Sequence, residues 1–117
     1  MAYDTIERCR AADVMSKISG KWKAAIIVNL AERPLQFGAL QRSLPGLSHK
    51  VLSQSLKDLI ATRIITRTVR SPAPLLKVEY SLTSMGRELC EPLHALDLWA
   101  RAHGVAGPNP DQSGVER

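Results

Sequence analysis

The 117-residue chain has no long apolar run and few cysteines. Its longest apolar run covers residues 24–28, whereas a membrane span needs roughly 20 apolar residues. The first residues do not follow the basic, apolar and small-residue order of a signal peptide. The sequence therefore predicts a cytoplasmic protein without a membrane partner.

Cysteine occurs only as Cys9 and Cys90, so the sequence has neither a close CxxC pair for zinc nor the dense disulfide framework of small secreted domains. We expect no bound metal and no other cofactor. The sequence also lacks a glycine-rich phosphate loop, a carboxylate pair and a nucleophile elbow. A small thiol enzyme is an alternative, with Cys9 as nucleophile and His49, His94 or His103 as base. Nothing in the sequence brings these groups together, and we expect a protein that is not an enzyme.

Basic residues are concentrated in the middle of the chain, whose formal net charge is +5. Residues 1–47 carry 7 basic and 4 acidic side chains, residues 48–80 carry 6 and 2, and residues 81–117 carry 3 and 5. Apolar residues make up 44% of the chain and charged residues 23%, which is typical of a globular domain. The charge distribution favours a polyanionic partner for the central segment.

Apolar residues recur every four positions between residues 13 and 30, which predicts a helix with one apolar face. These residues are Val14, Ile18, Trp22, Ile26 and Leu30. Gly20 is a candidate break within this helix. Pro34 prevents its smooth continuation, so we expect a short extended piece at 35–37 and a second helix at 38–44.

A third helix is predicted over residues 48–61, after a turn at Pro45 and Gly46. Ser48 is a favourable N-cap because its hydroxyl can accept a hydrogen bond from a backbone N–H that the helix leaves unpaired. The apolar residues fall on one face and are Leu52, Leu56, Leu59 and Ile60. The other faces carry His49, Lys50, Ser53, Gln54 and Lys57.

The remaining chain predicts a hairpin and a terminal helix. Residues 64–70 and 78–82 are rich in β-branched and aromatic residues and indicate two strands around a proline-bearing loop. A helix should follow from Thr83 to about His103, with a kink or junction at Pro92. Its apolar stripe is formed by Leu89, Leu93, Leu96 and Trp99, and it fits either the core of this chain or a dimer surface.

Residues 104–117 contain glycine and proline without periodic apolar residues, and they indicate a loose tail after a domain at 1–103. The predicted fold class is α+β and mostly helical. Its order of helix, short strand, helix, turn, helix and hairpin is that of a winged helix-turn-helix with added terminal helices.

This order of elements suits DNA, because the major groove admits one helix while a basic hairpin can contact phosphates. The helix predicted at 48–61 would expose Ser48, His49, Lys50, Ser53, Gln54 and Lys57. Gln54 could pair bidentately with adenine, and Lys50 with guanine or a phosphate. For each residue taken alone, a solvated helix face explains the pattern equally well.

The sequence FGALQRSLPGLSHKVLSQSLKDL, followed by ITR and VEYSLTSMGREL, closely resembles HxlR-type winged-helix transcriptional regulators, which are related to the MarR group. The resemblance runs from about Cys9 to Trp99. It implies a bacterial homodimer that binds an imperfect palindrome in double-stranded DNA, with residues 48–60 as recognition helix and 67–78 as wing. Phosphate contacts are expected from Arg42, Arg67, Arg70 and Lys77. The N-terminal segment and the helix after Thr83 would form the dimer interface, with Leu89, Leu93, Leu96 and Trp99.

The chain departs from the family pattern in three places. Arg10 follows Cys9 where the family usually has proline. The segment Ala61, Thr62 and Arg63 stands where an acidic residue and a glycine are usual. The wing tip at 71–77 is about one residue longer than is common and carries Leu75 and Leu76. An apolar tip would suit contact with protein, so a winged-helix interaction module without DNA binding is the alternative function.

Cys9 stands where many family members place a redox-reactive cysteine. Its cationic neighbours Arg8 and Arg10 would favour the thiolate, which is the form that reacts with oxidants and electrophiles. A buried, unreactive cysteine is the alternative. Cys90 would be a small core residue or a resolving thiol. The sequence does not identify a small-molecule effector.

Overall fold

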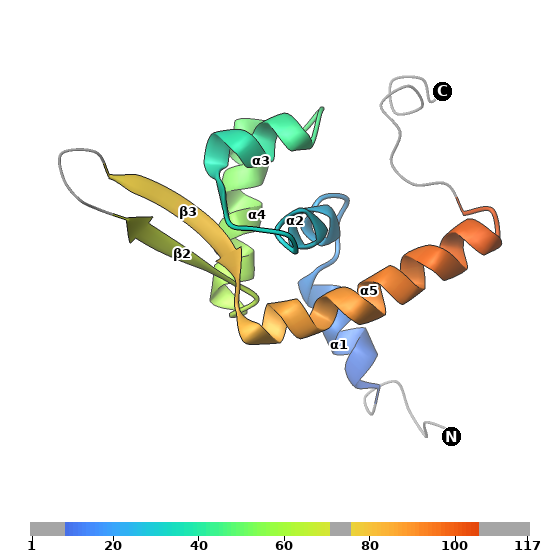
Figure 1. Cartoon of the computed structure of the whole chain (residues 1–117). Helices are drawn as coiled ribbons and strands as arrows, with labels where there is room; N and C mark the ends of the chain where they lie inside the picture. The colour runs from blue at the N-terminus through green and yellow to red at the C-terminus, as the bar shows by residue number, and fades with distance from the viewer. Residues whose placement is uncertain (1–8, 71–75, 106–117) are drawn as a thin grey trace.

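A computed structural model describes residues 9–70 and 76–105. Within these residues the chain forms five helices and a three-stranded antiparallel sheet of order β1-β3-β2 (Figure 1). The elements are α1 (Arg10–Lys17), α2 (Lys23–Asn29), β1 (Leu35–Gln36), α3 (Phe37–Ser43), α4 (His49–Ala61), β2 (Ile65–Arg70), β3 (Lys77–Leu82) and α5 (Ser84–Ala102). The β2–β3 hairpin projects from one side of the helices and α5 extends from the other. The predicted winged helix-turn-helix is confirmed.

The helix predicted over residues 13–30 is two helices, α1 and α2, and the first begins earlier, at Arg10. Gly20 lies between them with φ of +99°, a left-handed conformation that glycine adopts without steric cost. The apolar repeat crosses this break. Ile18, Ile26 and Leu30 are buried, whereas Val14 is 37% exposed.

The other predicted elements are displaced by about one residue. Phe37, expected in the extended piece, is the first residue of α3, and that helix ends at Ser43. The third predicted helix is α4, and Ser48 caps it by accepting the backbone N–H of Val51 at 3.1 Å. In the hairpin, β2 and β3 pair from Ile65 opposite Leu82 to Arg70 opposite Lys77.

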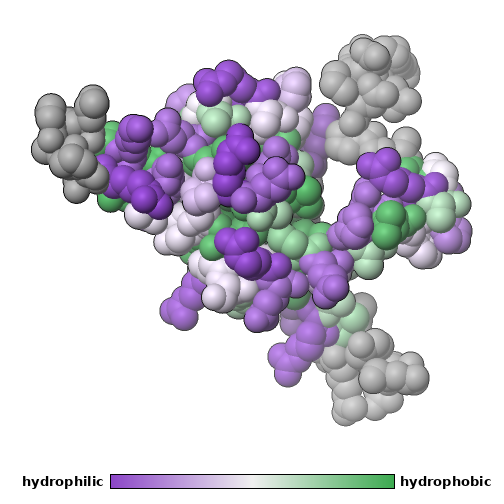
Figure 2. Space-filling view, viewed as in Figure 1, coloured by the Kyte–Doolittle hydropathy of each residue, from purple (hydrophilic) through white to green (hydrophobic). Residues whose placement is uncertain are grey.

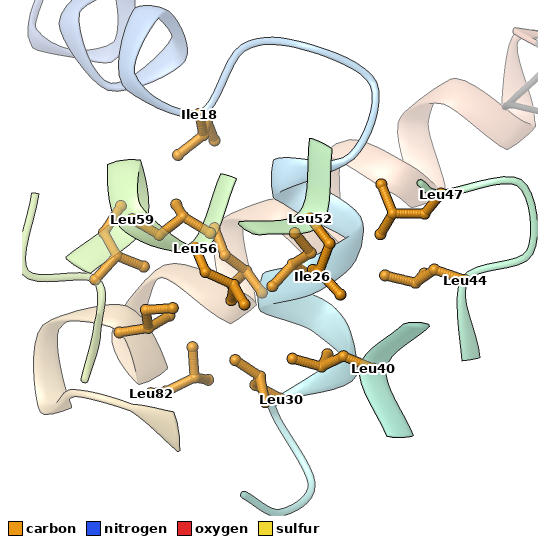
Figure 3. Packing of buried hydrophobic residues seen from close by; sticks show 13 residues of the cluster. Ile18, Ile26, Leu30, Leu40, Leu44, Leu47, Leu52, Leu56, Leu59 and Leu82 are labelled. Carbon is orange, nitrogen blue, oxygen red and sulfur yellow. The ribbon is translucent and has the colours of Figure 1, made fainter. Parts of the chain in front are cut away.

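The core lies between the helices and the base of the sheet (Figure 3). Of the apolar residues predicted on the third helix, Leu52, Leu56 and Leu59 are buried and Ile60 is half-buried. Leu52 and Leu56 lie beside Ile26 of α2 in the close-up view. The largest fully buried side chains are Ile26, Ile27, Leu30, Leu40, Leu52, Leu56, Leu59 and Ile65. This packing orients α4 so that its opposite face is exposed.

Thr83 joins the hairpin to α5. Its backbone N–H donates to the carbonyl oxygen of Ile64 at 3.0 Å, and its hydroxyl donates to the carbonyl oxygen of Arg63 at 2.7 Å. The same hydroxyl caps α5 by accepting the N–H of Gly86 at 3.0 Å. The first turn of α5 is therefore bonded directly to the base of the hairpin.

The terminal helix continues through Pro92 from Ser84 to Ala102. Of the two alternatives expected at Pro92, a kink or a junction, the junction is therefore wrong. Proline cannot donate to the carbonyl four residues earlier. That carbonyl belongs to Glu88, which is exposed, so water can replace the lost partner. Residues 71–75 of the predicted wing tip and residues 106–117 of the predicted tail lie outside the described residues.

None of the helices in the described part of the chain combines the length and apolar character needed to cross a membrane.

Candidate nucleic-acid interface

The turn between α3 and α4 fixes where α4 begins. Gln41 donates its side-chain amide to the carbonyl oxygen of Leu47 at 3.2 Å. Gly46 adopts φ of +92°, and the indole of Trp22 lies against it. Leu44 and Leu47 are buried on either side of this glycine. These contacts hold the first turn of α4 in a defined direction relative to α3.

The exposed face of α4 carries the residues that the sequence analysis selected. Ser48, His49, Lys50, Gln54 and Lys57 are exposed, and Ser53 is half-buried. The ring of His49 packs against that of Phe37, with centroids 4.6 Å apart. This contact ties the start of α4 to the start of α3.

Val51 was missed by the sequence analysis although it shares this exposed region. It is 43% exposed, three residues before Gln54. Because residues three apart are neighbours on a helix surface, Val51 lies beside Gln54. The signal that could have found it is an apolar residue outside the predicted apolar face.

Gln54 is held by an acidic residue one turn further along α4. Its Nε2 donates to Oδ1 of Asp58 at 3.0 Å. The other carboxylate oxygen of Asp58 lies 2.9 Å from Nζ of Lys23, at the start of α2. Hydrogen bonds from Lys23 and Gln54 hold the pKa of Asp58 below its ordinary value, and burial opposes them only in part. The carboxylate is therefore ionised at neutral pH.

Asp58 and Lys23 were not among the site residues predicted from the sequence. The four-residue spacing of Gln54 and Asp58 is a local signal that could have shown their contact. Lys23 is different, because it comes from another helix and reaches Asp58 only after α2 and α4 have packed together.

The hairpin presents three of the predicted phosphate-binding residues, and Arg67, Arg70 and Lys77 are all exposed. Arg70 donates its Nε to Oε1 of Glu79 at 2.7 Å, so its charge is partly neutralised. Arg42 is exposed on α3. Hydrophilic side chains are prominent on the hairpin at the left of Figure 2, with hydrophobic ones between them, and at the top of the view.

The two cysteines lie in different surroundings. Cys9 is half-buried and is the N-cap residue of α1. Cys90 is half-buried on α5, where it packs against the core with Sγ 3.7 Å from the carbonyl oxygen of Gly86. Both are free thiols. The described residues include no group of three or more His, Cys, Asp or Glu side chains that could hold a metal ion.

The apolar stripe of α5 has two parts. Leu89 and Leu93 are half-buried and pack against the core of this chain. Leu96 and Trp99, further along, are 52% and 56% exposed. Trp99 stacks on His103 with ring centroids 4.5 Å apart. Only the outer part of the stripe therefore remains uncovered in the single chain.

An apolar groove of 440 Å³ lies between α1 and the first half of α5. It is lined by Val14, Lys17, Thr62, Ile64, Met85, Glu88, Leu89 and Pro92. Every residue of α1 is exposed or half-buried, and Met15 is 58% exposed. The exposed apolar residues of α1 and α5 include Met15, Leu96 and Trp99. In Figure 1, α1 and the outer end of α5 lie away from the hairpin.

The family model described as HxlR-like helix-turn-helix matches residues 17–107. The chain belongs to this family. Among its relatives, the HTH-type transcriptional regulator YdzF of Bacillus subtilis is 41% identical over 96 residues, which cover 81% of this chain and 85% of YdzF. The HxlR-like chain is thus a DNA-binding transcriptional regulator of the helix-turn-helix class, as the sequence analysis predicted.

Solved structures of related regulators have the same fold. The redox regulator HypR in its reduced form matches with a TM-score of 0.73 and 29% identity, over 80% of this HxlR-like chain and 91% of HypR. Reduced YodB of Bacillus subtilis matches with a TM-score of 0.73 and 28% identity, over 86% of this chain and 92% of YodB. Both are described as regulators, in agreement with the family assignment.

Proposed function

We propose that the chain binds an imperfect palindromic operator as a homodimer, with α4 of each copy in a major groove. The observation that carries this proposal is the division of α4 into two faces. Leu52, Leu56 and Leu59 are buried, while Lys50 and Gln54 are exposed. A helix anchored in this way can enter a groove and keep its polar side chains directed at base edges.

The exposed side chains have different roles in this proposal. Gln54 pairs with adenine, Lys50 bonds guanine or a phosphate, and Val51 contacts a thymine methyl group. Base edges or nearby sugar-phosphate atoms are contacted by Ser48, His49, Ser53 and Lys57. The backbone phosphates are bound by Arg42, Arg67, Arg70 and Lys77.

Operator selection followed by binding titrations tests the proposal. DNA duplexes selected by the purified protein define the site, and Gln54→Ala should cost about 1–3 kcal/mol and relax the preference at one base position. Arg70→Ala should weaken binding to all DNA sequences alike and reduce the salt dependence of binding. Arg101→Ala is the matched control, because Arg101 also forms an exposed ion pair, with Asp97 on α5. If Gln54→Ala changes neither affinity nor preference, Gln54 does not read a base.

The proposed dimer is supported by the exposed outer half of α5. Leu96 and Trp99 would be covered by a second copy, and α1 with the apolar groove adjoins the same surface. Light scattering should give twice the monomer mass of 12.9 kDa. Trp99→Ala should shift the protein toward monomer, whereas Val28→Ala should not, although Val28 is similarly exposed on α2. A wild-type monomer at micromolar concentration would contradict the dimer.

We further propose that oxidation of Cys9 changes operator affinity. The structural relatives include HypR, described as a redox regulator in reduced and oxidised forms, and YodB treated with diamide. Cys9 adjoins α1, so a bond to the same residue of a second copy would change the placement of the two α4 helices. In forming this disulfide, two thiols lose two protons and two electrons, and diamide takes up both to become the hydrazine.

The test is a diamide titration of operator binding by wild type, Cys9→Ser and Cys90→Ser. We expect wild type and Cys90→Ser to lose affinity together, while Cys9→Ser remains active. An equal loss of operator affinity in wild type and Cys9→Ser, with protection in Cys90→Ser, would assign the effect to Cys90.

Residues 104–117 are proposed to take no part in DNA binding, so a chain that ends at residue 105 should bind the operator normally.

A further inference from the structure

We propose that Asp58 is a positioning residue for base readout, because it fixes the side-chain amide of Gln54 in the orientation that recognises adenine. The inference rests on the proposed function, since it requires Gln54 to contact a base. It adds Asp58, and Lys23 behind it, to the residues that determine sequence preference.

The chemistry of the three side chains sets the orientation of the amide. The ammonium of Lys23 can only donate hydrogen bonds, and it lies 2.9 Å from Oδ2 of Asp58. The ionised carboxylate of Asp58 can only accept. Its Oδ1 therefore requires a donor, and Nε2 of Gln54 supplies one at 3.0 Å. The amide nitrogen of Gln54 consequently faces Asp58 while its carbonyl oxygen remains available.

This orientation leaves Gln54 with one N–H donor and one carbonyl acceptor for a partner. Adenine presents a matching pair in the major groove, an acceptor at N7 and a donor at N6. Guanine presents two acceptors, N7 and O6, and so does not match. If the amide of Gln54 turned over, its carbonyl oxygen would face residue 58 and its two N–H groups would suit guanine.

Lys23 keeps the carboxylate in place. Its side chain is 19% exposed, compared with 40% for Asp58, so the ion pair is partly shielded from water on the lysine side. Lys23 belongs to α2, which packs in the core through Ile26 and Ile27. The carboxylate of Asp58 is therefore held by α2, through Lys23, as well as by its own helix α4. The lysine also neutralises a negative charge that would otherwise face the DNA phosphates.

Asp58→Asn tests the inference with a side chain of nearly the same size. Lys23 should attract the carbonyl oxygen of the asparagine, so that the asparagine NH₂ group faces Gln54 and Gln54 must accept from it. We expect the adenine preference at the Gln54-dependent position to fall about five-fold or more, in favour of guanine. Lys23→Met combined with Asp58→Asn frees the asparagine to turn, and this double variant should recover part of the adenine preference.

Two comparisons separate a positioning role from a merely structural one. Asp97→Asn removes the acid from a matched pair on α5, where Arg101 Nε lies 2.8 Å from Asp97 Oδ2, and it should leave the base preference unchanged. Thermal unfolding of each variant measures stability separately from base preference. A structural role alone would lower stability and overall affinity and leave the ratio of adenine to guanine affinity unchanged.

The outcomes distinguish this inference from the proposed function. If Gln54→Ala alters the preference at one base position and Asp58→Asn leaves the preference there unchanged, the positioning role of Asp58 is wrong. The assignment of α4 as recognition helix is then unaffected. If Gln54→Ala changes the preference at no base position, base readout by Gln54 is wrong, and the proposed role of Asp58 is wrong as well. A change in both variants at the same base position supports the inference.

Discussion

Gly86 on α5 lies so close to Ile64 at the base of the hairpin that a Cβ at position 86 would overlap the backbone carbonyl oxygen of Ile64. The same Cβ would be 3.2 Å from Cγ2 of the isoleucine. Because one of these neighbours is backbone, it cannot move aside by a change of rotamer. The close packing of the first turn of α5 on the hairpin thus requires glycine.

Gly86→Ala should destabilise the protein by about 1–3 kcal/mol, since overpacking exceeds the gain in helix propensity. Urea unfolding measures the change. The matched control is Gly38→Ala on α3, where the new methyl group would meet only the end of the flexible Arg42 side chain, at 3.2 Å. That control should be neutral or stabilising. Equal stability of Gly86→Ala and wild type would contradict the close packing.

Arg63→Gly should stabilise the protein by about 0.5 kcal/mol. Arg63 has φ of +65° and follows α4, and the N–H groups of Arg63 and Ile64 donate to Ile60 and Leu59. This is the Schellman pattern of helix ends, in which glycine is the usual residue at the left-handed position. Relief of about 1–2 kcal/mol of steric cost is offset in part by the greater freedom of glycine in the unfolded chain.

Thermal unfolding of Arg63→Gly should be compared with that of Arg67→Gly in β2. Glycine in a strand interior lowers stability, so Arg67→Gly should be less stable than wild type. If both substitutions destabilise equally, the left-handed backbone at Arg63 carries no cost.

Acid should remove the stabilising effect of the Asp58 carboxylate. Its folded-state pKa lies below the ordinary value because Lys23 and Gln54 bond the ionised form. A depressed pKa contributes stability above the unfolded-state value, and the contribution is lost as pH falls through the folded-state value. The stability difference between wild type and Asp58→Asn should be constant above about pH 5 and shrink below about pH 4. A difference that grows on acidification would contradict this assignment.

Glu79→Gln should tighten DNA binding without changing base preference. Glu79 holds Arg70 through a 2.7 Å contact, so the substitution removes a negative charge and frees a guanidinium for phosphate. Fluorescence anisotropy at several salt concentrations should show a slope steeper by up to about one unit. Asp97→Asn, which releases Arg101 on α5, should leave the slope unchanged. Weaker binding by Glu79→Gln would place Arg70 outside the DNA contact.

The sequence predicts the parts of the fold that depend on local signals. Ser48 caps α4 and Leu52 begins its buried face, because both effects operate within one or two helical turns. The contact of Lys23 with Asp58 is different, since it depends on how two helices pack. The helical period also did not separate Leu89 from Leu96, because it specifies a face of α5 and not the point at which the helix extends beyond the core.

Thr83 makes the direction of α5 and the geometry of the hairpin base interdependent, because one residue bonds Arg63, Ile64 and Gly86. Trp99 lies roughly 24 Å further along the helix axis. A small rotation of α5 at this joint therefore becomes a large displacement at Trp99. Conversely, in the proposed dimer a second copy bound to the outer end of α5 would set the angle of each DNA-binding unit. In the proposed dimer, the bonds of Thr83 would therefore help to set the distance between the operator half-sites, although Thr83 lies outside the proposed recognition helix.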